Sequence, residues 1–420
     1  MIKRIQILPH DGRRLFATRM IRLFAYGFLS VVLALYLSAA GLDERQIGLL
    51  LTLTLLGDTV ISLWITTHAD RIGRKRMLLV GAGLMIFAGG LFAVTRNFYL
   101  LLIAATIGVI SPSGNEIGPF MAIEQASLSQ LIPDKLRTGI FAWYNLVGSF
   151  STAVGALFGG VLSGKLQASG FSEFASYRVV ILGYAFIGIV LLGVIVSFSS
   201  KIDLHPDQST SPQKEKPRTF LGLNQSKRVV FRLAGLFSLD AFAGGFVIQT
   251  LVVFWFHIRF GADPVLLGSV FFGANILAGI SALSASWLAK RFGLVNTMVF
   301  THLPSNLLLI LVPLMPNLTL AILVLLLRFS ISQMDVPTRQ SYTIAVVTPE
   351  ERAAASGVTG VARTVGASLS PILTGLLLAN PALLSVPFFI SGGLKVVYDL
   401  ILFRSFRSMK PPEERTSNSE

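Results

Sequence analysis

Six charged residues lie deep within long apolar stretches of the sequence, at positions where a charge can bind a ligand or carry a proton. They are Arg22, Asp58, Glu116, Asp240, Arg328 and Arg363. None has an opposite charge three or four positions away, the spacing that brings two side chains together on a helix. Ionisable groups inside a membrane usually face a cavity or a partner on another helix. The expected chemistry is therefore the reversible binding of a solute or a proton.

Glu116 has the most unusual surroundings of the six. Pro112 and Pro119 flank it, and each removes a backbone hydrogen-bond donor, so the helix should kink here. Freed carbonyl groups beside a carboxylate form a site for a proton, a cation or a polar solute. We predict that Glu116 carries a coupled proton and that Asp58 is a second proton-coupling residue. The structural alternative is that Arg22 pairs with Glu116 or Asp58 and holds helices together.

Other residues are expected to line a substrate cavity or to form structural ion pairs. The predicted cavity residues are Arg22, Tyr26, Asn115, Tyr144, Asn145, Asp240, Arg328 and Arg363. Each aromatic residue among them also has the simpler interpretation of helix packing. Two pairs at i,i+4 are expected to neutralise themselves on one helix face: Asp335 with Arg339, and Lys395 with Asp399.

The elements that carry these residues are long apolar segments. Hydrophobic residues make up 53% of the 420 residues and charged residues 13%, about half the charged share of a soluble domain. Twelve apolar blocks of about 20 residues or more follow one another at approximately 15–39, 46–67, 77–95, 98–131, 138–164, 178–198, 229–256, 265–288, 295–315, 318–346, 353–379 and 383–405. Helices satisfy their own backbone groups in lipid. The expected fold class is therefore an all-α membrane protein with twelve transmembrane helices.

Composition also excludes several function classes. The net charge is +14, but the basic residues stand between the apolar blocks, as in polytopic membrane proteins, so we expect no nucleic-acid partner. The absence of cysteine excludes thiol catalysis and cysteine-bound metals. The sequence has no G-x-x-x-x-G-K-[ST] loop and its histidines lack metal-ligand spacing. We therefore expect neither an enzyme nor an ATP-driven pump, and no cofactor or metal.

The basic residues predict the orientation and the domains. With both termini in the cytoplasm, 24 Lys and Arg residues lie on the cytoplasmic side and five on the other side. We expect a multi-pass protein of the cell membrane whose first apolar block is retained as a helix. The predicted domains are an N-terminal six-helix half at 1–199, a cytoplasmic linker at 200–228, a C-terminal six-helix half at 229–408 and a cytoplasmic tail at 409–420.

The two halves repeat each other at an offset of 215 residues. Gln125 and Arg137 are 12 residues apart, as are Gln340 and Arg352, and each pair brackets a proline. Small residues of the fifth and eleventh blocks align in the same register, which lets helix backbones approach closely. Two repeated halves around a site at the membrane midplane are the plan of a secondary transporter.

One loop resembles a known signature. Residues 69–76 read Ala-Asp-Arg-Ile-Gly-Arg-Lys-Arg, which resembles the D-R-x-G-R-[RK] loop of the major facilitator superfamily, and residues 290–293 hold a degenerate copy, Lys-Arg-Phe-Gly. The resemblance covers nearly the whole chain and implies the major facilitator fold of two pseudo-symmetric six-helix halves. Thr66 departs from the family, which usually has a glycine at that position.

The resemblance also implies a gating role for this loop. The gating residues would be Asp70, Arg71, Gly73, Arg74 and Glu124. In the family the aspartate is thought to contact the start of helix 11 and latch the outward-open state, and Arg74 would pair with Glu124 near the cytoplasmic end of helix 4. Gly73 permits a tight turn. The alternative is a basic loop that only sets the topology.

These observations lead to two interpretations of function. The first is proton-coupled export, or antiport, of a small drug-like or metabolite solute by alternating access. An antiporter-like glycine pattern at 142–160 favours it, although the proline of that pattern is missing there and stands instead at Pro371; close helix packing explains the pattern equally well. The alternative is a proton-coupled carrier of an organic or phosphorylated anion, because Arg328 and Arg363 place two cations in the C-terminal half. The expected partners are a small-molecule substrate, protons and the lipid bilayer, and the chain is expected to act as a monomer.

Overall fold

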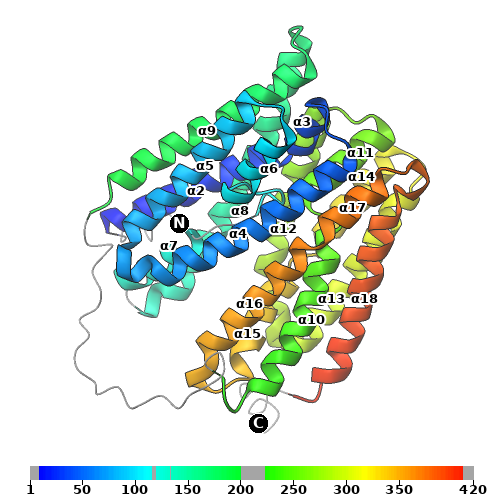
Figure 1. Cartoon of the computed structure of the whole chain (residues 1–420). Helices are drawn as coiled ribbons and strands as arrows, with labels where there is room; N and C mark the ends of the chain where they lie inside the picture. Colours follow the sequence, from blue (N-terminus) through cyan, green and yellow to red (C-terminus); the bar gives the residue numbers. More distant parts are fainter. Residues whose placement is uncertain (1–8, 116–119, 133, 200–222, 410–420) are drawn as a thin grey trace. The chain divides into compact units, whose positions relative to one another are not determined.

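The computed structural model describes residues 9–115, 120–132, 134–199 and 223–409, and this part of the chain is built from helices joined by short turns (Figure 1). The N-terminal helices are α2 (His10–Ser30), α3 (Leu33–Ala39), α4 (Glu44–Ile72), α5 (Arg74–Val94), α6 (Phe98–Ile107), α7 (Phe120–Leu131), α8 (Asp134–Ala168) and α9 (Glu173–Val196). The C-terminal helices are α10 (Lys227–Gly245), α11 (Gln249–Phe260), α12 (Pro264–Phe292), α13 (Leu294–Leu311), α14 (Leu318–Phe329), α15 (Asp335–Ala345), α16 (Arg352–Ser368), α17 (Ser370–Leu378) and α18 (Val386–Phe406).

Polar residues at the predicted turns start the helices that follow them. The Asp43 side chain accepts a hydrogen bond from the backbone of Gln46, whose own side chain bonds back to Asp43, so the two form a capping box at the start of α4. Asn97 and Asn317 cap α6 and α14 in the same manner. These caps satisfy amide groups that would otherwise lack partners at the helix ends.

The helices have the length and composition of membrane spans. Nine spans of the described residues are long and apolar enough to cross a membrane, and α2 and α3, bent by 43° at their junction, make a tenth if counted together. The shorter apolar helices α6 and α14 account for the remaining two predicted blocks. The prediction of an all-α membrane protein is confirmed, and the count of twelve spans fits these helices.

Every third predicted span is broken within the membrane segment. The first span breaks between α2 and α3, the fourth between α6 and α7, the seventh between α10 and α11, and the tenth between α14 and α15. Discontinuous helices in transporters surround the substrate site, where freed backbone groups face a cavity. The breaks therefore point to the segments that hold the functional groups.

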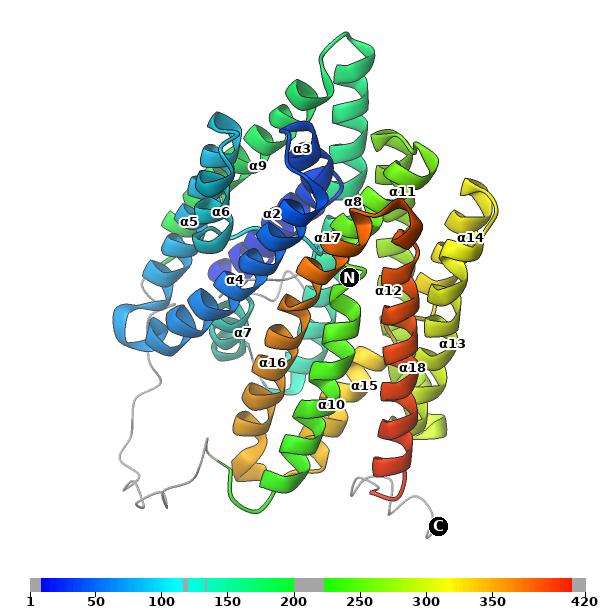
Figure 2. The same ribbon diagram turned by 45° about the vertical axis from the view of Figure 1, so that its right-hand side comes forward.

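Two compact units can be distinguished in the chain, Met1–Gln208 with Ile248–Ile276, and Ser209–Val247 with Leu277–Glu420. In the first unit α2 packs against α8 and α5 against α9. In the second unit α10 packs against α16 and α13 against α18, as both ribbon views show (Figures 1 and 2). Helix α11 and the first part of α12 belong to the first unit, although the predicted division at the linker placed them with the C-terminal half.

Glycines bring the main helix pair of each unit into close contact. A Cβ atom at Gly155 of α8 would lie 2.0 Å from the carbonyl oxygen of Phe24 in α2. In the second unit, a Cβ atom at Gly366 of α16 would lie 2.4 Å from the carbonyl oxygen of Ser238 in α10. The small residues of the fifth and eleventh predicted spans therefore allow backbone contact between helices.

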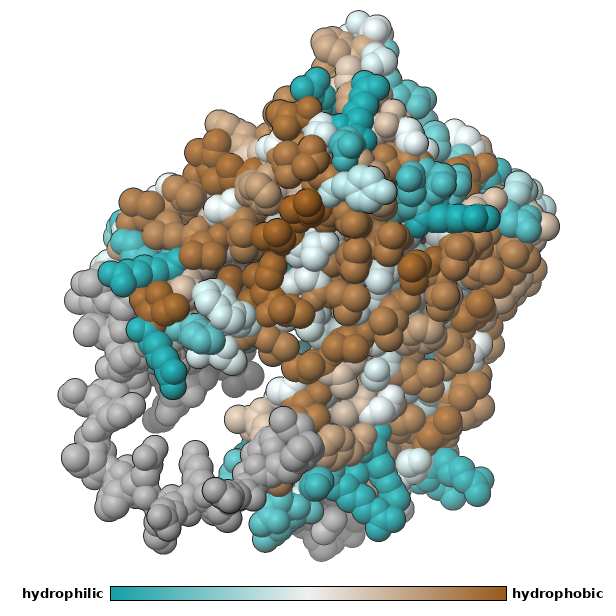
Figure 3. Space-filling model, viewed as in Figure 1, coloured by the Kyte–Doolittle hydropathy of each residue, from teal (hydrophilic) through white to brown (hydrophobic). Residues whose placement is uncertain are grey.

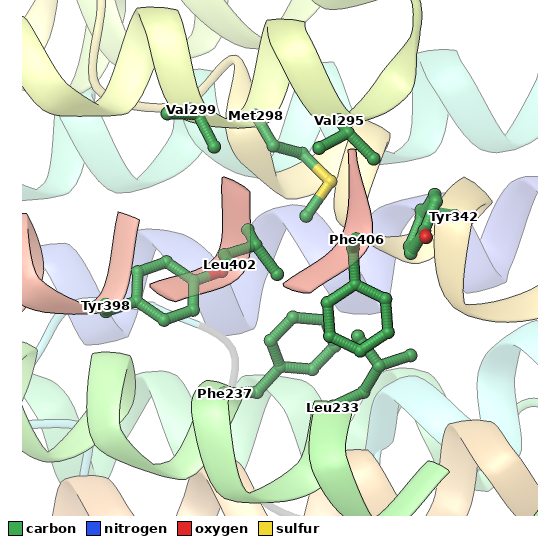
Figure 4. Close-up of a cluster of buried hydrophobic side chains, with 9 residues drawn as sticks. All are labelled: Leu233, Phe237, Val295, Met298, Val299, Tyr342, Tyr398, Leu402 and Phe406. Atoms are coloured by element: carbon green, nitrogen blue, oxygen red, sulfur yellow. The ribbon is translucent and has the colours of Figure 1, made fainter. Parts of the chain in front are cut away.

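Apolar side chains both fill the units and cover their outer faces. Nine buried side chains from α10, α13, α15 and α18 form one core of the second unit (Figure 4): Leu233, Phe237, Val295, Met298, Val299, Tyr342, Tyr398, Leu402 and Phe406. The visible outer face is mostly hydrophobic along the helices, with hydrophilic residues gathered near helix ends (Figure 3). Such a surface suits lipid rather than water.

Candidate functional site

The first unit contains a fully buried ion pair between α2 and α7. The two guanidinium nitrogens of Arg22 each donate to one oxygen of Glu124 at 2.8 Å, and both side chains have an exposed fraction of 0%. Thr18 donates to the same carboxylate at 2.8 Å and the Tyr144 hydroxyl also donates to it. A bidentate pair with its remaining lone pairs satisfied is the arrangement that makes a buried charge pair stable.

The position of Glu124 corrects one sequence-based expectation, whereas the alternative pairing of Arg22 with Glu116 lies outside the described residues. Glu124 does not pair with Arg74, because it lies in the interior of the unit while Arg74 donates to the exposed Gln130 at 2.8 Å. The bidentate partner of Arg22 is Glu124, an acid that the sequence analysis had assigned to the loop. The family resemblance placed Glu124 near the cytoplasmic end of the fourth span, beside the loop at 69–76. In the structure its side chain points from α7 toward α2.

The α4–α5 loop makes different contacts from those expected. Gly73 has φ +110°, so the turn requires a residue without a Cβ atom. Lys75 donates to the carbonyl oxygens of Val196 at 2.8 Å and Phe198 at 2.7 Å, at the end of α9. Arg71 lies in the last turn of α4, and the side chain of Asp70 lies outside what the structure describes, so its proposed latch stays a prediction.

Hydrogen bonds join three of the helix breaks in the first unit. The Thr250 hydroxyl donates to the Ser30 carbonyl oxygen at 2.8 Å, and the Thr250 amide donates to the Pro112 carbonyl oxygen at 3.1 Å. The Gln249 side chain donates to the Ser30 hydroxyl at 2.8 Å. Carbonyl groups freed at the breaks after α2 and α6 are therefore bonded by the start of α11.

Loss of the Thr250 hydroxyl is expected to loosen α11 from α2. Thr250→Val keeps the side-chain shape and removes one hydrogen bond, about 1 kcal/mol or a fivefold shift in a local opening equilibrium. Because the chain has no cysteine, a single Ser113→Cys label reports this opening, and we expect maleimide to react about fivefold faster. Thr106→Val is the matched control, because the Thr106 hydroxyl donates to a carbonyl oxygen of its own helix. Equal rates in all three proteins would contradict the role of Thr250.

The second unit contains a larger buried cluster centred on Asp240 of α10. Lys395 of α18 donates to its Oδ1 at 2.6 Å. Arg339 of α15 and Arg363 of α16 donate to its Oδ2 at 3.2 and 3.1 Å. One carboxylate therefore receives three permanent cations from three helices, which fixes these helices around it.

One predicted pair of this unit is confirmed and the other is wrong. Arg339 donates to Asp335 at 2.9 Å across one helix turn, as expected. Lys395 does not pair with Asp399, because its ammonium group reaches Asp240 on α10 instead. Asp399 turns toward α13, where its oxygens contact His302 at 2.8 Å and Asn306 at 2.9 Å.

His302 was missed by the sequence analysis, although it joins the two carboxylates of this cluster. Its Nδ1 lies 2.8 Å from Asp399 Oδ1 and its Nε2 lies 3.8 Å from Asp240 Oδ1. The side chain is buried. The signal in the sequence was the polar pair His302 and Asn306 at i,i+4 within an apolar block.

Two arginines of the second unit keep donors that are not used by the cluster. The side chain of Arg363 has an exposed fraction of 34%. Arg328, at the end of α14 before the break of the tenth span, forms no ion pair with any residue that the structure describes, and its Nε is buried without a hydrogen-bond partner. A guanidinium with unused donors suits a carboxylate or phosphate group.

One member of each cluster occupies a repeated position, with opposite charge. Glu124 and Arg339 are 215 residues apart, the offset of the sequence repeat. Each contacts the first helix of its unit, through Arg22 in α2 and Asp240 in α10. In the first unit one arginine pairs with the Glu124 carboxylate. In the second unit the Asp240 carboxylate contacts Arg339, Arg363, Lys395 and His302. The second unit is therefore the richer candidate site.

The remaining predicted residues are scattered. Asp58 is buried and accepts a hydrogen bond from Ser62 at 3.4 Å, and Tyr26 is fully buried. Asn145 accepts from Arg19 at 3.1 Å, and Asn115 is exposed at the break of the fourth span. Glu116 lies outside the described residues, so its role as proton carrier stays a prediction.

Comparison with known proteins agrees with this architecture. The family model described as Major Facilitator Superfamily matches residues 15–334. The solved structure of a point mutant of the nucleoside transporter NupG superposes with a TM-score of 0.73 at 14% identity, over 94% of this chain and 99% of that chain. An identity this low is evidence for the fold alone.

The sequence relatives differ in how much of the chain they match. The membrane protein YJR124C of Saccharomyces cerevisiae is 32% identical over 93% of both chains. A Na(+), Li(+), K(+)/H(+) antiporter of Planococcus maritimus is 30% identical over 36% of this chain and 33% of its own. The quinolone resistance protein NorA of Staphylococcus aureus is 26% identical over 51% of this chain and 52% of its own.

Proposed function

This chain belongs to the Major Facilitator Superfamily and is a membrane transporter of that family, and we propose that it is a proton-coupled secondary transporter of a small organic or phosphorylated anion. Solute would cross by alternating access, with the broken spans lining its path. The observation that carries this proposal is that the Asp240 cluster of the second unit, counted together with Arg328, holds four permanent cations and three carboxylates.

A count of those charges supports an anionic substrate. Three carboxylates, Asp240, Asp335 and Asp399, balance Arg339, Arg363 and Lys395. Arg328 then remains as a further cation of the same unit. The Nε of Arg328 is buried without a hydrogen-bond partner, which costs about 1–3 kcal/mol, and an anion that reached it would remove that cost. Arg328 and the exposed part of Arg363 are the proposed anion ligands.

Proton-coupled export of a drug-like or metabolite solute is the second candidate. The names of two partial relatives, a cation/H(+) antiporter and a quinolone resistance protein, favour it. In that case Glu116 and Asp58 would carry the proton, because the Asp240 carboxylate is already occupied by cations. Under either candidate we propose that the protein is a monomer in the cell membrane with both termini in the cytoplasm, as the distribution of basic residues suggests.

Replacing Arg363 by Lys tests the anion proposal. Lys keeps the charge and loses the planar fork that binds a carboxylate or phosphate through two hydrogen bonds. In proteoliposomes with an imposed pH gradient, we expect Arg363→Lys and Arg328→Lys each to raise the half-saturating concentration of an anion about tenfold, or about 1.4 kcal/mol. Matched pairs such as benzoate with benzyl alcohol and glucose 6-phosphate with glucose separate charge from shape.

Arg404→Lys serves as the matched control, because Arg404 is an exposed residue at the end of α18. It should transport like the unmodified protein. Unchanged anion transport in both Arg328→Lys and Arg363→Lys would count against the anion proposal. Transport of only the neutral member of each pair would favour the second candidate function, export of neutral or cationic solutes.

A further inference from the structure

We propose that His302 in α13 binds the coupled proton and that its protonation adds to the positive charge that holds the anionic substrate in the second unit. This inference rests on the proposed anion transport and adds the residue and the sign of the coupling. Proton and anion would then bind together and cross in the same direction.

The imidazole of His302 lies between two carboxylates. One carboxylate faces each ring nitrogen: Asp399 at 2.8 Å from Nδ1 and Asp240 at 3.8 Å from Nε2. A neutral imidazole has one N–H, and the 2.8 Å contact with Asp399 assigns it to Nδ1. The Asn306 amide nitrogen, 3.1 Å from Nδ1, donates to the other oxygen of Asp399. In the imidazolium Nε2 also carries a proton and lies 3.8 Å from Asp240 Oδ1, which is within ion-pair distance.

Other charged and titratable groups on the neighbouring helices surround the His302 ring. Those that face this cluster are Asp240 on α10, Asp335 and Arg339 on α15, Arg363 on α16, and Lys395, Tyr398 and Asp399 on α18. Lys395 and His302 approach the same oxygen of Asp240, at 2.6 and 3.8 Å. The ring therefore lies among three carboxylates and three permanent cations.

Charge accounting links the proton to the anion. With a neutral imidazole, the three carboxylates of the cluster are balanced by Arg339, Arg363 and Lys395. Protonation of His302 adds a second positive charge to that of Arg328, so an anion on Arg363 and Arg328 is attracted by both. Each ligand therefore raises the affinity for the other, by thermodynamic linkage.

His302 is better suited to bind the coupled proton than the other groups of the cluster. Histidine is the side chain whose charge changes between pH 5 and 8 without a large perturbation. Asp240 accepts from three permanent cations, so protonating it would remove the carboxylate that Arg363 and Lys395 contact. The three permanent cations, for their part, are already bonded to carboxylates.

The first test needs no transport. The ¹⁵N-histidine NMR spectrum of the purified full-length protein contains five histidines, and His302→Gln identifies the signal of His302. We expect this signal to change from the Nδ1–H tautomer to the imidazolium between pH 8 and 5. Saturating benzoate or inorganic phosphate should move the midpoint to higher pH, and benzyl alcohol should not. A ring that keeps one form over this range, or a midpoint that neither anion moves, would overturn the proposal.

The second test measures coupling in proteoliposomes. Anion affinity of the unmodified protein should weaken by up to tenfold per pH unit above the midpoint, as expected for one linked proton, and that of His302→Gln should not depend on pH. His302→Gln should also lose at least about tenfold of the pH-driven rate while keeping counterflow exchange. His257→Gln is the matched control, because His257 lies in the first unit and its ring contacts the carbonyl oxygen of Ala262 in a loop.

A second variant and the unmodified protein separate the possible failures. If His302→Gln does not fold, Asp399→Asn keeps the ring and removes its Nδ1 acceptor, so the NMR midpoint should move to lower pH; an unmoved midpoint would overturn the role of the Asp399 contact. If the unmodified protein moves no anion under a pH gradient, the proposed function itself fails. If it does so and His302→Gln behaves identically, only the assignment of the proton to His302 is overturned.

Discussion

Glu124→Gln is expected to lower the free energy of unfolding of the transporter by about 3–5 kcal/mol. The amide keeps the shape of the carboxylate but removes the negative charge that both terminal nitrogens of the buried Arg22 guanidinium contact. Thermal unfolding in detergent, followed by loss of the monodisperse peak in size-exclusion chromatography, measures the effect. Little protein should survive at a temperature that the unmodified transporter tolerates.

Three further variants distinguish the charge from the contact. Arg22→Gln with Glu124→Gln removes both charges and should recover most of the loss, because a buried pair often contributes little over a neutral replacement. Tyr144→Phe removes one hydrogen bond to the carboxylate and should cost about 1.5–3 kcal/mol. Arg74→Gln changes the rim of the same unit and should cost less than about 0.5 kcal/mol. A Glu124→Gln protein as stable as Arg74→Gln would contradict the structural role of the pair.

The sequence predicts the helices well because each depends on local composition. An apolar block of about 20 residues must form a helix in lipid to satisfy its backbone groups. Asp43, Asn97 and Asn317 predict helix starts, and the structure confirms them. The glycines that bring α2 to α8 and α10 to α16 could also be recognised by their spacing. Family membership follows from the same features together with the loop at 69–76.

The partners of the buried charges could not be predicted in the same way. Pairing at i,i+4 considers one helix only, so it found Asp335 with Arg339 and failed for Lys395, whose long side chain reaches α10. Choosing between Asp399 and Asp240 requires knowing which helices are adjacent. That information lies in contacts between residues 155 positions apart.

Glu124 shows the limit of reasoning from a family pattern. Its distance along the chain from the end of the fourth span fits a residue at the rim, and the analogy assigned it to Arg74. Helix α7 lies beside α2, and Glu124 on it meets Arg22. Finding this pair from the sequence would have required knowing that these two helices are adjacent.

Asp240→Asn is expected to reduce transport by about 100-fold or more, equivalent to about 2.7 kcal/mol in the rate-limiting step. The amide leaves Lys395, Arg339 and Arg363 close together without the carboxylate that they share. Proteoliposome uptake, normalised to the amount of inserted protein, measures the loss. Asp240→Glu keeps the charge and should retain far more activity, and equal activity of the two variants would contradict a role for this charge.

Double variants that remove one cation together with the Asp240 charge show whether the substrate requires Arg363 or Lys395. Asp240→Asn with Lys395→Met restores the charge balance and should recover about tenfold of the lost transport, together with stability. Asp240→Asn with Arg363→Gln restores the same balance and should recover stability, but it should not recover anion transport, because Arg363 is a proposed anion ligand. Equal recovery of transport in both double variants would mean that charge balance alone is sufficient for transport. The partly exposed guanidinium of Arg363 would then be a structural group and not an anion ligand.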